Sequence, residues 1–183
     1  MPSAFPGFDS PAVGFEQPFD MLAACHERVQ RSLALLGRLI GHVDAHGHDA
    51  KSRSAAIDVL RYFDLAAPLH HQDEELHVFP MLAGSDDAGL TAAVARLRGD
   101  HARMEALWAG LRSVLGAWSR NDAAGAIDAA VRRQAAEFEH LYAAHVQTED
   151  GVMPPAVRAR MDATHLAIMS ADVEQRRRAA APS

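Results

Sequence analysis

Apolar residues recur along most of the chain at the three- and four-residue steps of an amphipathic α-helix. Four long stretches carry this pattern, and none of them shows the two-residue alternation of a β-strand. Each stretch therefore predicts a helix with one stripe of core-facing side chains. The stripes run from Leu22 to Val43, from Ile57 to Leu82, from Leu90 to Trp118 and from Ile127 to Val152.

Segments rich in glycine, aspartate and asparagine separate the four stretches, at residues 44–49, 84–89 and 121–125. These residue types favour turns. Short turns between long helices make neighbouring helices antiparallel. We therefore predict an all-α fold, namely an up-down-up-down antiparallel four-helix bundle with an extra C-terminal helix.

The ends of the chain are expected to flank this bundle. Prolines and glycines predict an irregular N-terminal arm over residues 1–18. The bundle is expected over residues 19–153, followed by a helical extension over residues 154–183. Its helix should cover roughly residues 156–178, with a break near Asp162. The sequence leaves open whether this helix caps the bundle or supports a homodimer.

Composition restricts the partners and the compartment. The chain has 183 residues, which suits a single domain with a sizeable core. Its net charge of −6 and pI near 6.0 argue against a nucleic-acid partner or an anionic membrane surface. We expect no signal peptide and no membrane-spanning run. Cys25 is the only cysteine, which excludes an internal disulfide and favours a cytoplasmic location.

A four-part pattern of two histidines, a glutamate and a proline occurs twice in the chain. The two histidines are 45 residues apart in the first copy and 44 in the second. The glutamate follows four residues later, so it shares a helix face with the second histidine. Imidazole and carboxylate together are the ligands of non-haem iron and related transition metals. The copies comprise His26, His71, Glu75 and Pro80, and His101, His145, Glu149 and Pro154.

The four histidines should lie at one level of the bundle. The midpoints between consecutive histidines fall at positions 48.5, 86 and 123, inside the three predicted turns. At about 1.5 Å of rise per residue, an error of two residues moves a ligand only ~3 Å. Each histidine also belongs to an apolar stripe and should point inward. Four imidazoles and two carboxylates in an apolar core are costly without a cation, so we predict a dinuclear metal site.

Three further residues compete for roles at this site. His70 and Glu74 form another His-x-x-x-Glu, shifted by about 100° around the helix. The match between the two copies favours His71 and Glu75 as the inward pair. Glu105, four residues after the third histidine, is a candidate third carboxylate ligand, although a place beside the ligands is favoured. The alternative reading is a structural helical bundle in which these residues form buried pairs without metal.

The order His, His-x-x-x-Glu, His, His-x-x-x-Glu on four helices, with a proline after each glutamate, resembles the hemerythrin-like (HHE cation-binding) family. The likeness covers about residues 20–155, and the stretch from His71 to Glu75 with the following Val-Phe-Pro80 is particularly similar. It implies two iron ions in a left-handed four-helix bundle, with a bridging oxo, hydroxo or water; other divalent metals stay open. By this resemblance, His26 and His71 bind one iron, His101 and His145 bind the other, and Glu75 and Glu149 bridge them.

The resemblance implies a protein that binds or senses oxygen, nitric oxide or iron. Oxygen-carrying members have a fifth histidine at the position of Glu105, so this chain looks more like the iron-sensing and iron–sulfur-repair branches. Repair of iron–sulfur clusters, or reduction of nitric oxide or peroxide, is the alternative function, and the sequence does not decide whether the protein is an enzyme. Tyr62, Glu105 and Tyr142 are candidates for orienting the histidines. Pro68 should distort the second helix, since it removes a backbone bond to Asp64.

Overall fold

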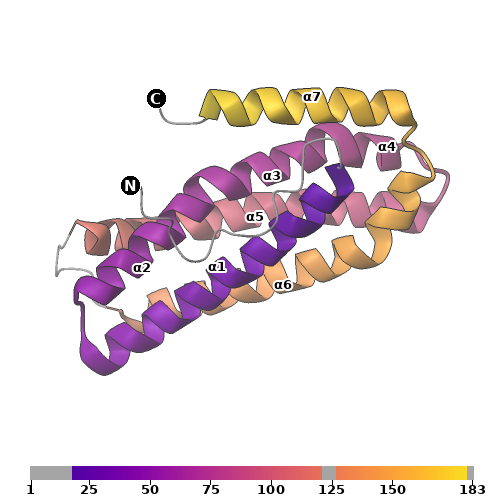
Figure 1. Cartoon of the computed structure of the whole chain (residues 1–183). Coiled ribbons are helices and arrows are strands. Elements are labelled where there is room, and N and C mark those ends of the chain that lie inside the picture. The colour runs from indigo at the N-terminus through magenta and orange to yellow at the C-terminus, as the bar shows by residue number, and fades with distance from the viewer. Residues whose placement is uncertain (1–17, 121–126, 181–183) are drawn as a thin grey trace.

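A computed structural model of the chain describes residues 18–120 and 127–180, with the side chains of Pro18, Phe19 and Pro154 excepted (Figure 1). The described residues form helices joined by short turns and contain no strand, which confirms the all-α prediction. The elements are α1 (Pro18–His46), α2 (Ala50–Arg61), η1 (Tyr62–Ala66), α3 (Ala67–Asp73), η2 (Glu74–Val78), α4 (Phe79–Ala83), α5 (Ala88–Ser119), α6 (Ala129–Arg158) and α7 (Ala163–Ala180).

The elements α2 to α4 follow one another without a turn and make one long rod. This rod and three single helices, α1, α5 and α6, are the four rods of the bundle and surround a common core. The helix α1 contacts α2 and α6, and α5 also contacts α2 and α6. The helix α7 lies outside this group, along α3 at the top of Figure 1, and contacts α3 and α1. The molecule is thus a helical bundle with an added C-terminal helix.

Aspartates start three of the helices, and two of these aspartates lie in predicted turns. The carboxylate of Asp49 accepts hydrogen bonds from the backbone N–H groups of Lys51 and Ser52, the first donors of α2. Asp87 caps α5 and Asp128 caps α6 in the same way. Such caps satisfy backbone donors that have no partner within the helix. The first two turns thus lie where expected, whereas residues 121–125 fall outside the described residues.

The core consists of two apolar clusters with a polar layer between them. One cluster is centred on Phe63, Trp108 and Phe138, and the other on Phe79 and Leu97. Along each rod, the buried histidines and glutamates come between a residue of one cluster and a residue of the other. The polar side chains therefore lie in one layer, enclosed by apolar side chains on both sides.

The expected stripe of the second rod is wrong at its start. Ile57 is 45% exposed, whereas Ala56 and Val59 are buried. The rod also contains two wide π-type turns, η1 and η2, which each hold one more residue than an α-helical turn. The added residues rotate the stripe relative to a continuous α-helix, so a regular 3.6-residue period misplaces its members.

The C-terminal region also differs from expectation. The helix expected over residues 156–178 is divided, because α6 continues through Pro154 as far as Arg158 and α7 begins only at Ala163. The break lies where it was predicted, and the Asp162 carboxylate there accepts a hydrogen bond from the backbone N–H of His165. The predicted arm over residues 1–18 falls outside the described residues, except for Pro18, the first residue of α1.

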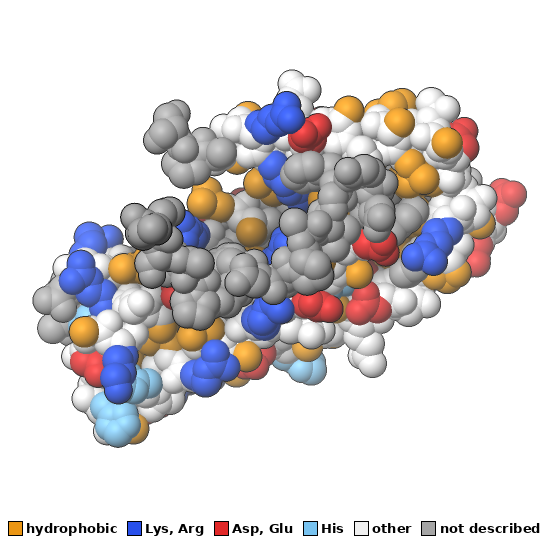
Figure 2. Space-filling view, in the orientation of Figure 1, with side chains coloured by type: hydrophobic (Ala, Val, Ile, Leu, Met, Phe, Trp, Pro, Cys, Tyr) orange, Lys and Arg blue, Asp and Glu red, His pale blue; other side chains and the backbone are white. Residues whose placement is uncertain are grey.

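Charged side chains of both signs are mixed over the face shown in Figure 2. Histidines gather in that view at the end where α1 and α2 meet, and His42 and His46 there have ring centroids 4.9 Å apart. No described helix combines the length and the apolar character that crossing a membrane would require.

The helix α7 is held to the rod by a buried carboxylate. Asp73 at the end of α3 is 0% exposed. Its two oxygens contact Arg176 Nη1 at 2.7 Å and Arg177 Nη2 at 2.6 Å. Arg176 also binds Asp172 one turn earlier on α7. Two cations neutralise one buried anion, so this contact holds α7 against the rod.

Replacing Asp73 by Ala should remove the ion-pair partner of Arg177, leave Arg176 with Asp172 alone, and lower the free energy of unfolding by about 3 kcal/mol, because one partner of a buried ion pair is lost. Urea denaturation measures this value. The control is Glu137→Ala, which removes the exposed pair of Arg103 and Glu137 and should cost about 0.5 kcal/mol or less. Equal losses in the two variants would contradict the role given to Asp73.

Candidate metal centre

Six buried side chains from four rods make up the polar layer. His26 comes from α1, His101 from α5, and the pair His145 and Glu149 from α6. The second rod contributes a histidine at the centre of α3 and a glutamate that opens η2. Both pairs have the i, i+4 spacing that puts two side chains on one helix face. The residues from the second rod are His70 and Glu74.

The two wide turns of the second rod bring His70 and Glu74 inward. In η1 the backbone N–H of Ala67 donates to Tyr62 O, five residues back, and in η2 that of Phe79 donates to Glu74 O. Each donor directly precedes a proline, Pro68 or Pro80. A proline has no N–H, and its ring crowds the carbonyl four residues earlier. The distortion expected at Pro68 thus takes the form of a wide turn, and Pro80 adds another.

The six side chains form two overlapping groups in which the ligand atoms lie within 4.8 Å of one another. Both groups contain the two glutamates, and each adds two histidines from different rods. All four imidazoles turn Nε2 towards the middle of the layer. The groups are His26, His70, Glu74 and Glu149, and Glu74, His101, His145 and Glu149.

Each glutamate offers one oxygen to each pair of histidines. Glu74 Oε1 lies 3.2 Å from His70 Nε2, and Glu74 Oε2 lies 3.3 Å from His101 Nε2. Glu149 Oε2 lies 3.1 Å from His26 Nε2, and Glu149 Oε1 lies 3.1 Å from His145 Nε2. This arrangement suits carboxylates that bridge two cations, with two imidazoles at each cation.

Several of these atoms lack a hydrogen-bond partner among the described residues. They are His26 Nε2, Glu74 Oε2 and both carboxylate oxygens of Glu149, all of them buried. Buried polar atoms without a partner are costly. Nitrogen and oxygen atoms that face one another around a common centre satisfy their lone pairs by binding a cation. The donor set therefore fits a metal centre.

The charges in the layer favour a cation as well. Burial would lower the pKa of His26, but the adjacent carboxylates of Glu149 and Glu74 raise it to about 11. Burial and the nearby charge of Glu149 raise the pKa of Glu74. Burial opposes ionisation of Glu149, but the adjacent imidazoles of His145 and His26 outweigh it and hold that pKa below its usual value. The two carboxylates thus attract positive charge to the centre of the layer.

Two of the imidazoles are oriented from outside the layer by carboxylates. His26 Nδ1 donates to Asp150 Oδ1 at 2.9 Å, and His101 Nδ1 donates to Glu75 Oε1 at 2.8 Å. With Nδ1 protonated, the lone pair of Nε2 is directed inward. Such contacts fix the tautomer of a metal-binding histidine.

The structure brings together four of the six ligands predicted from the sequence, namely His26, His101, His145 and Glu149. The inward orientation expected of Glu75 is wrong, since its side chain is 45% exposed and contacts the outer edge of His101. His71 lies outside both groups. Its ring stacks on that of His101, with centroids 4.0 Å apart and planes at 9°.

A second match between the copies was present in the sequence. His26 and His70 are 44 residues apart, as are His101 and His145. Glu74 precedes Pro80 by six residues, and Glu149 precedes Pro155 by six. Because prolines occupy both 154 and 155, the two copies can be aligned in two ways. The alignment of Pro80 with Pro154 selects His71 and Glu75 in the first copy, whereas the alignment of Pro80 with Pro155 selects His70 and Glu74. All three spacings agree in the alignment that uses His70 and Glu74.

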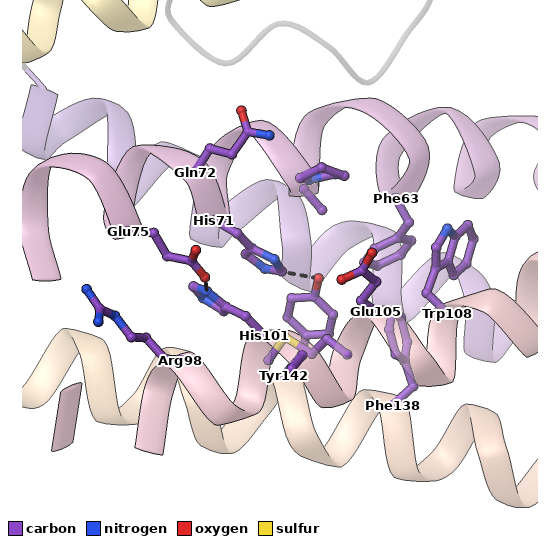
Figure 3. Close-up of a pocket in the computed structure, with 14 residues that line it drawn as sticks. Phe63, His71, Gln72, Glu75, Arg98, His101, Glu105, Trp108, Phe138 and Tyr142 are labelled. Atoms are coloured by element: carbon purple, nitrogen blue, oxygen red, sulfur yellow. Dashed lines mark hydrogen bonds and ion pairs between the residues drawn. The ribbon is translucent and has the colours of Figure 1, made fainter. Parts of the chain in front are cut away.

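The candidate orienting residues lie around the layer without entering it. The Tyr142 hydroxyl lies 3.3 Å from His71 Nε2, and the Tyr62 hydroxyl donates to Cys25 O at 3.4 Å. Glu105 is exposed and belongs to neither group. It lines a cavity of about 430 Å³ between α3 and α5, together with His71 and His101. Figure 3 shows Glu75 and His101 turned towards each other at one end of this cavity and Tyr142 turned towards His71.

A second, smaller cavity reaches the layer from another side. It measures about 130 Å³, and its lining includes His26, Glu74 and Glu149. Apolar side chains such as Met153 and Val157 make up part of its wall. Small molecules can therefore approach the layer along two routes.

A buried layer of carboxylates and imidazoles inside a helical bundle is typical of a metal-binding helical protein. The chain belongs to the hemerythrin HHE cation-binding domain family, whose sequence profile matches residues 17–157. It is also 41% identical over 68 residues to an uncharacterized protein of Haemophilus influenzae. That match covers 37% of this chain and 40% of the length of the relative.

The hydroxyl of Tyr142 should contribute more to stability than that of Tyr62, because its contact with His71 is slightly shorter and the Tyr142 side chain is more buried. Tyr142→Phe should lower the free energy of unfolding by about 1 kcal/mol, the usual contribution of one buried hydrogen bond. Urea denaturation in the presence of a chelator provides the measurement. Tyr62→Phe is the matched control and should cost less; the reverse order would refute the assignment.

Proposed function

We propose that the chain is a non-haem di-iron protein of the hemerythrin type that binds or senses oxygen, nitric oxide or iron. The observation that carries the proposal is the pair of overlapping groups that share both Glu74 and Glu149. Two carboxylates with an oxygen for each histidine pair are what a dinuclear centre requires. The mixture of imidazole and carboxylate suits iron among the transition metals.

In this proposal, each iron has two imidazoles, and the two glutamates bridge the irons. His70 and Glu74 take the places that the sequence alone assigned to His71 and Glu75. Bound iron would supply a change between the ferrous and ferric states and the capacity to bind a diatomic ligand. The ligands of one iron are His26 and His70, and those of the other are His101 and His145.

The surrounding side chains limit access to the centre. Phe79 stacks on the ring of His101 at 5.5 Å, and His71 covers it at 4.0 Å. Met104 and Val78 are buried beside the layer and keep water away from it. A dry site with narrow approaches favours the binding of a small uncharged ligand over exchange with bulk solvent. Oxygen and nitric oxide are ligands of this kind.

The finer topology belongs to the same proposal. An up-down-up-down order of the four rods is supported by the two short turns within the described residues, at 47–49 and 84–87, and by the contacts of each rod with two others. That order brings His70 and His145 from parallel rods into one layer.

Anaerobic loading with ferrous iron, removal of the excess and elemental analysis should give two irons per chain. Glu74→Gln should lose at least one iron, because it removes a bridging carboxylate. Glu75→Gln is the matched neighbour and should retain two, since Glu75 contacts only the outer nitrogen of His101. Loss of iron from Glu75→Gln with full retention in Glu74→Gln would instead support the bridging role that the sequence alone assigned to Glu75. A wild-type protein that folds but retains no iron would refute the function.

Oxygen uptake by the loaded protein separates binding from turnover. For a binding or sensing protein, we expect the amount of oxygen taken up to be limited by the amount of protein and to be released on degassing. Absorption spectroscopy follows both changes. Sustained consumption of oxygen, nitric oxide or peroxide in the presence of a reductant would instead favour the enzymatic alternative.

A further inference from the structure

The two halves of the centre are built alike around their first histidines. In each half, the residue after the bridging glutamate is acidic and reaches the first histidine of the other half. Glu75 follows Glu74 and binds Nδ1 of His101, whereas Asp150 follows Glu149 and binds Nδ1 of His26. The distances are 2.8 and 2.9 Å. Each half thus orients one imidazole of the other.

The second histidines, by contrast, have different surroundings. The residue before His101 is Asp100, which is buried, and its Oδ2 lies 3.6 Å from His145 Nδ1. This distance is within the range of an ion pair and slightly longer than a hydrogen bond. A carboxylate therefore faces Nδ1 of His145.

The equivalent position in the first half, before His26, is occupied by Cys25. This buried side chain supplies a thiol in place of a carboxylate. The second histidine of that half is His70, which is 2% exposed, and its Nδ1 has no hydrogen-bond partner among the described residues. Nδ1 of His145 also lacks a hydrogen-bond partner among the described residues, so the two second histidines differ in that a carboxylate lies 3.6 Å from Nδ1 of His145.

An outer carboxylate raises the basicity of a metal-binding imidazole, and removing one reduces metal affinity by about 10- to 100-fold. The pair His101 and His145 has one hydrogen-bonded outer carboxylate, Glu75, and a second carboxylate, Asp100, at 3.6 Å, whereas the pair His26 and His70 has Asp150 alone. We propose that the two metal positions are unequal: the His101–His145 position binds first and tightly, and the His26–His70 position binds a weaker, exchangeable ion. This inference rests on the dinuclear centre of the proposed function.

The cavities agree with this difference. The smaller cavity is lined by His26 and both bridging glutamates, and neither His101 nor His145 is among its described lining residues. The larger cavity reaches His101, but His71 covers the face of that imidazole. The weaker position therefore also has a direct approach, through the smaller cavity. Its occupancy would follow the concentration of free metal, which is the behaviour that an iron sensor needs.

Anaerobic titration of the full chain with Co²⁺, followed by visible absorption and calorimetry, tests the inference. We expect two binding steps whose affinities differ by about tenfold or more. Because repulsion between two cations also separates the steps, the assignment of each step to a histidine pair is decisive. His70→Ala should keep the tighter step, and His145→Ala should keep only the weaker one.

Substitution of the outer residues provides a second, independent arm. Asp100→Asn should weaken the tighter step by about tenfold and narrow the gap between the steps. Cys25→Ser is the matched control in the other half and should leave both affinities unchanged. Circular dichroism checks the fold of each variant, and His145→Gln replaces His145→Ala if the latter does not fold.

The outcomes distinguish a failure of the proposed inequality from a failure of the dinuclear centre. Two Co²⁺ ions that bind the wild-type protein with a single affinity would overturn the inequality and leave the dinuclear centre standing. The same holds if His145→Ala retains the tighter step. Fewer than two bound ions in the wild-type protein would refute the proposed function itself.

Discussion

The structure depends on the burial of two carboxylates, Glu74 and Glu149, in a single layer at the centre of a helical bundle. Like charges so close together oppose folding unless positive charge lies between them. The arrangement of the six side chains that face one another, and their attraction for a cation, follow from that constraint. The apolar clusters on both sides increase its effect, because they remove the water that would otherwise screen the charges.

Proline chemistry determines which side chains meet this constraint. In the second rod, the wide turns that precede Pro68 and Pro80 add residues to the helix, and His70 and Glu74 face inward as a result. In α6, the two consecutive prolines follow Glu149 within an uninterrupted helix. A proline, which cannot donate a backbone hydrogen bond, thus changes which neighbouring side chains of its helix face the core.

Much of the fold and part of the site could be predicted from the sequence. The stripes and the aspartate-rich turns indicated the helices and the level of His26, His101, His145 and Glu149, because α1, α5 and α6 keep a regular helical period through the layer. In the second rod, the prediction was one residue out of phase at Ile57, His71 and Glu75, although the other buried members of the stripe, such as Phe63 and Val78, were placed correctly. A π-type turn arises from the local balance of backbone hydrogen bonds, and no apolar pattern records it.

The buried contact between Asp73 and the arginines of α7 bears on where this domain ends. The family profile stops at residue 157, yet Arg176 and Arg177 neutralise the residue that directly precedes Glu74. A fragment trimmed to the family boundary would keep all six centre residues and expose an uncompensated anion beside one of them. The unit that holds the centre therefore extends about twenty residues beyond the unit that sequence similarity delimits.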